Sequence, residues 1–223
     1  MSLTRYGYRN AISAFAEFPT ENARRILPPG LEPAELHHGA SVLSMTAFDF
    51  TESEVGAYGE VVMSVIVAPL VQPGERLPKS AFYPYLVATT TRAAREHAID
   101  RWHLPHWMDD VEIAFSRDGS SLTARVAVEA EPVAELSVGE HSWQPVSHLY
   151  QSFMRDASGS YFAKVHMDGA QSEHEEETGR LCLHAHPFNK DLAIDEVADV
   201  PFRELWMRDG VQTFEPLVQL QSA

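Results

Sequence analysis

Histidines are the side chains here that could most readily carry chemistry, because the chain has eleven and several are clustered. His103 and His106 are three residues apart, while His184 and His186 alternate within a run typical of a β-strand. Two imidazoles on one face of a strand could bind Zn or Fe. The sequence after His186 lacks the glutamate and glycine pattern of a cupin site. We therefore predict packed histidines and no bound metal, with a His184–His186 metal site as the alternative.

Nucleophilic and cofactor-dependent chemistry has little support in the sequence. The single cysteine, Cys182, lies between two leucines, where a thiol is usually packed and inert. The sequence contains no Gly-x-Ser-x-Gly elbow, P-loop or Gly-x-Gly-x-x-Gly segment. We expect no cofactor.

The charge of the chain restricts its partners. Lys and Arg total 17 against 32 Asp and Glu, a formal net charge of −15. Such a surface repels nucleic acids and anionic membranes, so we expect neither as a partner. The amino-terminal residues do not resemble a secretory signal, and no apolar stretch is long enough to span a bilayer. One cysteine cannot form an intramolecular disulfide, and we expect a cytoplasmic protein whose partner is a small molecule.

The elements that must position these side chains are mainly strands. Apolar or alternating runs predict strands at 41–50, 60–67, 83–91, 111–115, 122–130, 160–167 and 180–186. The runs at 111–115 and 122–130 flank Asp118-Gly119, which predicts a hairpin. The runs at 160–167 and 180–186 are expected to pair across the acidic segment 168–178, which we interpret as a solvated loop.

Helical signals are fewer. Short helices are predicted at 20–27, where Pro28-Pro29 stops the helix, and at 91–100. The chain shows no repeat and no long linker, so residues 1–223 are expected to form a single domain. The fold class is mainly β with minor α, an antiparallel sheet system that is closed or sandwiched.

Three segments, taken in order, form a further pattern. Arg9 precedes the short helix that ends in a leucine/proline turn. Residues 56–60 have the form Gly-x-Tyr-x-Glu and end at Glu60. Arg95-Glu96 is followed at 102–107 by WHLPHW. This ordered set resembles the acetoacetate decarboxylase-like family, whose third motif is Arg-Glu-x-Trp-Gly-Phe-Pro-Lys-Lys-Leu. Four extra residues lie before the tryptophan here, and the second half of the chain matches only by strand pattern.

The resemblance implies a closed, antiparallel, cone-like β-barrel with a few short helices, a largely apolar pocket and a homo-oligomer. It also implies a reaction, because family decarboxylases form a Schiff base between a β-keto acid and the first motif lysine. The second lysine lowers the pKa of the first. His106 and Trp107 occupy these two positions, and the stretch 36–48 lacks the acid that the family has there. We therefore expect the Schiff-base mechanism to be lost.

The resemblance also implies a site. His106 and Glu60 are the candidate catalytic residues for acid–base chemistry, and Arg9 is expected to bind a carboxylate or an enolate oxygen. The other candidate substrate-binding residues are Arg95, Glu96, Trp107 and Tyr85. The structural alternatives are a surface cation for Arg9, a strand-entry residue for Glu60, an exposed helical pair for Arg95-Glu96 and a space-filling side chain for His106.

These observations predict a lyase-type enzyme of secondary metabolism. It would act on a small keto acid or polyketide-like carbonyl compound by decarboxylation, dehydration, cyclisation or α-carbon proton transfer, without a lysine Schiff base. The alternative is a non-catalytic barrel that binds an apolar small molecule, which the number of aromatic residues favours.

Overall fold

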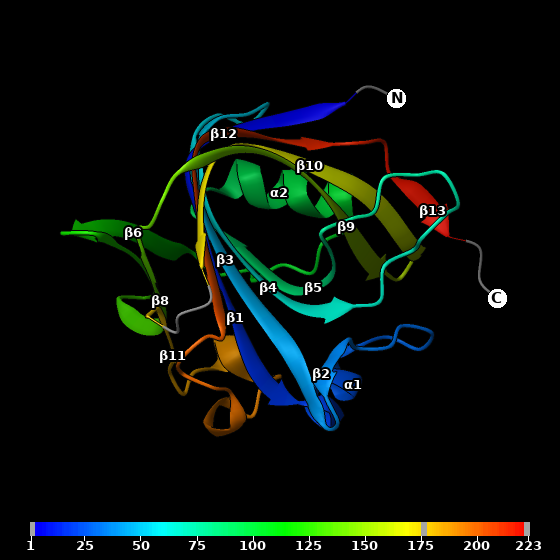
Figure 1. Cartoon of the computed structure of the whole chain (residues 1–223), viewed down its shortest axis with the longest axis horizontal. Coiled ribbons are helices and arrows are strands. Elements are labelled where there is room, and N and C mark those ends of the chain that lie inside the picture. Colours follow the sequence, from blue (N-terminus) through cyan, green and yellow to red (C-terminus); the bar gives the residue numbers. More distant parts are fainter. Residues whose placement is uncertain (1–2, 175–177, 221–223) are drawn as a thin grey trace.

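Seven long strands form the wall that surrounds the candidate site (Figure 1). The computed structural model describes residues 3–174 and 178–220. The strands are β1 (Thr4–Pro19), β3 (Ala40–Glu52), β4 (Tyr58–Val67), β5 (Ser80–Thr89), β9 (Gln144–Asp156), β10 (Gly159–His174) and β12 (Arg203–Phe214). They follow the order β1-β12-β10-β9-β5-β4-β3, and β1 pairs with both β12 and β3. The sheet is therefore a closed barrel, and the mainly β fold class is confirmed.

One seam of the barrel is parallel. Ser80–Phe82 of β5 pairs with Tyr150–Ser152 of β9 in the same direction, whereas the other neighbouring strands of the barrel are antiparallel. The expectation of a wholly antiparallel barrel is wrong at this seam. More than fifty residues separate the two strands, so the chain leaves the barrel and re-enters at the end where β5 began.

The segment between β5 and β9 contributes three strands to a second, four-stranded sheet. Its strands are β6 (Val111–Asp118), β7 (Ser121–Val128), β8 (Glu131–Gly139) and β11 (Arg180–Leu183), in the order β11-β8-β7-β6. The hairpin predicted around Asp118-Gly119 is confirmed as β6–β7. The predicted pairing of 160–167 with 180–186 is wrong, because β10 pairs with β9 and β12 while β11 pairs with β8. The prediction of a solvated loop at 168–178 is also wrong for residues 168–174, because β10 continues to His174. Residues 175–177 lie outside the described residues.

Two helices and several short elements complete the fold. Helix α1 (Thr20–Ile26) starts after Pro19, and the Thr20 hydroxyl contacts Ser41 instead of capping the helix. Helix α2 (Arg92–Trp102) is capped by Thr91, whose side chain accepts a hydrogen bond from the Ala94 N–H. Within residues 3–174 and 178–220, no helix is long and apolar enough to cross a membrane. The short elements are β2 (Glu35–His37), β13 (Val218–Leu220), η1 (Pro187–Asn189) and η2 (Ile194–Glu196).

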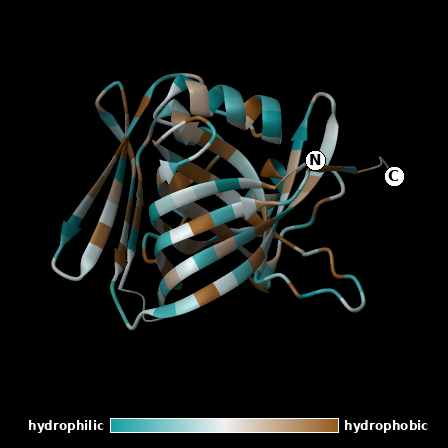
Figure 2. Ribbon diagram, turned by 90° about the horizontal axis from the view of Figure 1, so that it is seen from above, coloured by the Kyte–Doolittle hydropathy of each residue, from teal (hydrophilic) through white to brown (hydrophobic). Residues whose placement is uncertain are grey.

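The main core lies between the outer wall of the barrel and the second sheet. Alternate residues of β1, β3 and β4, such as Ile12, Leu43 and Met63, pack there against Val126 and Leu136. The residues between them face the barrel interior, so these strands are buried on both faces. Figure 2 shows the resulting change of hydropathy along the strands. This double burial explains the nearly continuous apolar run of β4, in which each face contributes its own apolar residues.

Candidate functional site

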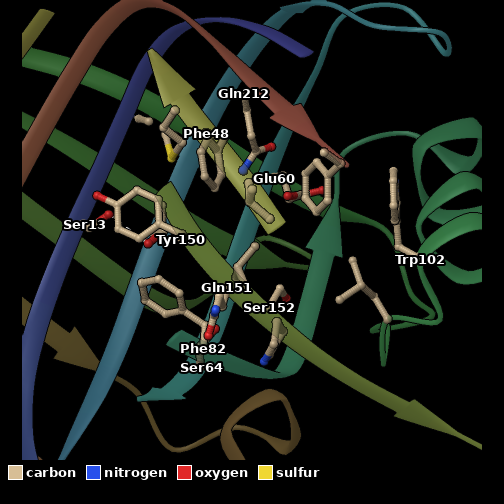
Figure 3. A pocket seen from close by; sticks show the side chains of 18 of the residues that line it. Ser13, Phe48, Glu60, Ser64, Phe82, Trp102, Tyr150, Gln151, Ser152 and Gln212 are labelled. Carbon is tan, nitrogen blue, oxygen red and sulfur yellow. Dashed lines mark hydrogen bonds between the residues drawn. The ribbon is translucent and has the colours of Figure 1, made fainter. Parts of the chain in front are cut away.

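The barrel contains a cavity of about 110 Å³ with mostly apolar walls (Figure 3). Aromatic and methionine side chains form most of the surface: Phe15, Phe48, Phe82, Trp102, Tyr150, Phe214, Met154, Met167 and Met207. An apolar cavity of about 150 Å³ accepts benzene, so this smaller one has room for a molecule of at most about six heavy atoms. Among the described residues that line it, none is lysine, arginine or histidine. The cavity therefore suits a small, uncharged guest.

Glu60 is the acidic side chain of this lining. It lies on the inner face of β4 with Val62 and Ser64, and its cross-strand neighbours are Phe48 and Thr89. Burial in apolar surroundings raises the pKa of its carboxyl group to about 8, because desolvation disfavours the charged form. In the part of the chain that the structure describes, no hydrogen bond or ion pair reaches this carboxyl group. Glu60 is therefore a largely protonated acid at neutral pH, and its carboxyl group is available to hydrogen-bond a molecule bound in the cavity.

Most other polar groups of the lining are already paired. The hydroxyls of Ser13 and Thr46 lie 2.8 Å apart. The Gln151 amide donates to the Leu70 carbonyl at 2.7 Å and accepts from its N–H at 2.8 Å. Such pairs leave little polarity for a ligand.

Gln212 is a second polar group that remains available. It lies on β12, lines the cavity, and its amide has no hydrogen-bond partner among the described residues. Figure 3 shows this amide pointing toward Glu60. Gln212 was not predicted from the sequence because β12 carries no motif. The only available signal was the alternation of inward-facing and outward-facing residues along that strand. A carboxyl group and an amide thus converge on one part of the cavity.

His106 is not among the residues that line the cavity. The segment after α2 adds to the edge of β5 through a bridge between His106 and Val87. The imidazole Nε2 lies 3.1 Å from Oγ1 of Thr89, the neighbour of Glu60, and Nδ1 contacts the Trp107 carbonyl. Burial lowers the pKa of His106, so the ring is neutral. Both ring nitrogens are engaged, and the structure does not form the expected His106–Glu60 pair across the cavity.

Arg9 lies outside the barrel, which corrects its expected position. The register with β3 shifts between Tyr8 and Asn10, so the inward side chains are Tyr8 and Ala11, three residues apart. Arg9 falls in this irregularity and points outward, 67% exposed, with Nε 3.6 Å from Asp49. It does not face a guest.

Tyr85 is displaced for the same physical reason. The register of β5 with β4 shifts at this point, because Pro84 pairs with Ser64 and Leu86 with Met63. Tyr85 has no partner on β4 and packs against the outer core, where its hydroxyl is buried without a hydrogen bond to any described residue. The extra residue of the bulge reverses the alternation, so Tyr85 does not line the cavity.

The remaining candidate residues also lie outside the cavity lining. Trp107 packs against Phe188, and its buried indole N–H has no hydrogen-bond acceptor within the described part of the chain. Arg95 is 14% exposed and donates to the Met108 carbonyl, which ties α2 to the segment that follows. Glu96 is 55% exposed and pairs with Arg92 one turn away, so the alternative of an exposed helical pair describes Glu96 but not Arg95.

The histidine pair near the carboxyl end of β11 does not form a shared face. Both residues follow the last residue of β11, Leu183, and His186 caps the short helix η1 by accepting from the Phe188 N–H. Among the described residues, no three His, Cys, Asp or Glu side chains are grouped to hold a metal ion.

With this geometry in place, the chain can be compared with known proteins. No family model and no curated protein matches its sequence. An acetoacetate decarboxylase structure matches with a TM-score of 0.63 and 14% identity over 99% of this chain and 90% of that chain. The enzyme from Legionella pneumophila subsp. pneumophila str. Philadelphia 1 matches with a TM-score of 0.64 and 15% identity over 97% and 87%.

The fold is that of acetoacetate decarboxylase. The enduracididine biosynthesis enzyme MppR, complexed with pyruvate, shares it with a TM-score of 0.61 and 14% identity over 99% of this chain and 92% of that chain. The acetoacetate decarboxylase fold therefore holds both a decarboxylase and an enzyme that binds pyruvate, and in this chain its chemistry must be argued from the side chains.

The lysines of this acetoacetate decarboxylase-like barrel are away from the cavity. The chain has three, none of which lines it. Lys79 pairs with Glu173 at 2.6 Å, Lys164 pairs with Glu75 at 2.7 Å, and Lys190 is exposed. An amine that forms a Schiff base must reach the bound carbonyl carbon, and none of these three lysines borders the cavity that would hold it.

Proposed function

We propose that this protein binds a small, uncharged carbonyl compound in the barrel and transfers a proton at the carbon next to the carbonyl group. The observation that carries the proposal is Glu60, a carboxyl group without a protein partner in an apolar cavity. A pKa of about 8 keeps Glu60 protonated enough to bind a neutral oxygen. Its ionised form, once populated, is a stronger base than an ordinary carboxylate.

The substrate class follows from the charges of the lining. A keto acid brings a carboxylate, which needs a cation or several donors when it leaves water. Arg9 lies outside and no described lining residue is cationic. A ketone or related neutral compound of roughly six heavy atoms meets both the size and the polarity of the cavity.

The proposed step uses two side chains. The Glu60 carboxylate takes a proton from the carbon next to the carbonyl, and the electron pair of that C–H bond moves to the carbonyl oxygen as an enolate. The Gln212 amide donates a hydrogen bond to this oxygen, where negative charge develops. Return of a proton from Glu60 to carbon completes the exchange without a cofactor.

Hydrogen–deuterium exchange on 2-pentanone tests the proposal. Wild type should accelerate loss of the proton signals next to the carbonyl in D₂O, followed by NMR. Glu60→Gln keeps a hydrogen-bond donor but has no base, so the exchange rate should fall about 100-fold or more while binding persists. Glu52→Gln, an exposed carboxyl at the end of β3, is the matched control and should behave as wild type. Equal rates in wild type and Glu60→Gln would contradict the proposal.

Binding without turnover is the second candidate. It is favoured by the lack of a second base that works near neutral pH among the described lining residues, since His106 is not one of them and burial raises the pKa of Tyr150, the other titratable side chain there. In that case 2-pentanone should raise the Tm of wild type, because a ligand that binds only the folded state stabilises it, and no exchange above the buffer rate should appear.

A further inference from the structure

A smaller cavity of about 20 Å³ adjoins the main one at Glu60. The two share Glu60, Trp102, Leu104, Gln212 and Phe214. The smaller one adds Tyr6, Tyr58, His97 and Ala98, from β1, β4 and α2. A site needs roughly 10–15 Å³ to hold one water molecule, so this space fits one and not a second ligand.

The polar groups around this space have defined directions. The indole N–H of Trp102 can only donate, and it donates to the Tyr6 hydroxyl oxygen at 2.7 Å. The same oxygen lies 2.6 Å from Nε2 of His97. Burial lowers the pKa of His97, and Arg101 lowers it further while Glu54 opposes the shift. The ring is therefore neutral, and the one hydrogen of Tyr6 is directed to Nε2.

His97 connects this arrangement to the outside. Its side chain is partly exposed on α2, whereas Tyr6 and Tyr58 are buried. Tyr58 has no hydrogen-bond partner in the part of the chain that the structure describes, so its hydroxyl is available to a water in the smaller cavity. A water there has Glu60, Tyr58, Tyr6 and Gln212 around it, the two to four polar partners that a buried water requires.

From this geometry we infer that the smaller cavity is a water site, and that its water, Tyr6 and His97 carry the proton of Glu60 to solvent. One proton passes from Glu60 to the water, one from the water to Tyr6 and one from Tyr6 to Nε2 of His97, while Nδ1 of His97 releases one to solvent. Glu60 loses one proton in total, and each intermediate group regains what it gives. This route lets a proton taken from a bound molecule leave while that molecule still fills the main cavity. The role of the route in catalysis rests on the proposed function.

Infrared spectroscopy tests the route without any substrate. The C=O band of the protonated Glu60 is identified as the band that Glu60→Gln lacks, and its shift on mixing with D₂O at pH 6 reports exchange of the carboxyl hydrogen. His97→Ala should slow this shift at least tenfold, and free imidazole in the buffer should restore most of the rate. His97→Gln gives the same information if His97→Ala does not fold, and His38→Ala, an exposed histidine, should match wild type.

The outcomes separate the two proposals. If the Glu60 band is present and His97→Ala exchanges as fast as wild type, the relay is wrong and the proposed function stands. Slow exchange that imidazole leaves unchanged also overturns the relay, because a purely structural effect would not respond to imidazole. If wild type shows no band that Glu60→Gln lacks, Glu60 is ionised at pH 6 and the relay is wrong, whereas the proposed function is then decided by the exchange of 2-pentanone.

Discussion

At the scale of single residues, Glu60 and Gln212 show what a sequence reveals and what it does not. Glu60 stands in a short motif, and its position in the pocket was expected from the resemblance; the structure places it in the cavity lining. Gln212 is an ordinary amide on a strand without a motif, and only the register of β12 turns it inward. His106 was expected in the cavity, yet backbone pairing with β5 places its ring against Thr89.

Glu60 should make the stability of the protein depend on pH in an unusual direction. Its pKa is about 8 in the folded state and near 4.5 unfolded, so the folded state binds the proton more tightly between these values. The free energy of unfolding should therefore fall as pH rises from about 5 to about 8 and then level off. Urea titrations should show wild type losing a few kcal/mol relative to Glu60→Gln over this interval. A difference that stays constant from pH 5 to 9 would mean that Glu60 is not desolvated.

At the scale of elements, two bulges separate the expected site from the observed one. Counting back in steps of two from inward-facing Ala11 and Val87 places Arg9 and Tyr85 inside the barrel. Each strand contains an irregularity at that point, and the extra residue turns the side chain outward. Both helices and several of the strands follow from local pattern, but a bulge depends on the partner strand, so the sequence alone does not reveal it.

The irregular stretch of β1 packs against a glycine of β12, Gly210, which pairs with Tyr8 and permits a test of the packing. A Cβ on Gly210 would overlap the Asp168 carbonyl and the Tyr8 ring, whose hydroxyl bonds that carbonyl at 3.0 Å. Gly210→Ala should therefore lower the free energy of unfolding by about 3 kcal/mol or more, measured by urea denaturation.

Gly7→Ala is the matched control for that substitution. It lies nearby on β1, and a Cβ there would meet its nearest atom, Cβ of Glu52, at 3.3 Å. The cost should stay below about 1 kcal/mol. Similar losses in the two variants would show that the packing around Tyr8 is not specifically tight.

At the scale of the whole molecule, the sequence pattern predicts four of the seven barrel strands, β3, β4, β5 and β10, but not β1, β9 or β12, and the resemblance predicts that the barrel closes. The parallel seam was not predictable, because it depends on how the chain returns after the second sheet. The homo-oligomer stays a prediction. The cavity is a whole-molecule property as well, since seven strands and the end of α2 each contribute to its wall.

A substitution that fills the cavity should weaken ligand binding without lowering the stability of the fold. Ser64 is buried and lines the cavity, so Ser64→Leu adds apolar atoms to an existing space. Binding of 2-pentanone should weaken at least tenfold, whereas the Tm should stay equal or rise, because empty space costs about 24 cal/mol per Å³. Ser116→Leu, on the exposed face of β6, should leave binding unchanged. Binding that survives in Ser64→Leu would place the guest elsewhere.

The pairing of β1 with β12 also has a consequence for the newly made chain. The first long strand of the barrel needs the last long one as a neighbour, across a separation of about two hundred residues. During synthesis, the wall stays open until Phe214 has left the ribosome, and the apolar interior faces water or a chaperone until then. Closure over such a separation is slow. Nascent chains stalled before β12 should therefore remain sensitive to proteases that the finished barrel resists.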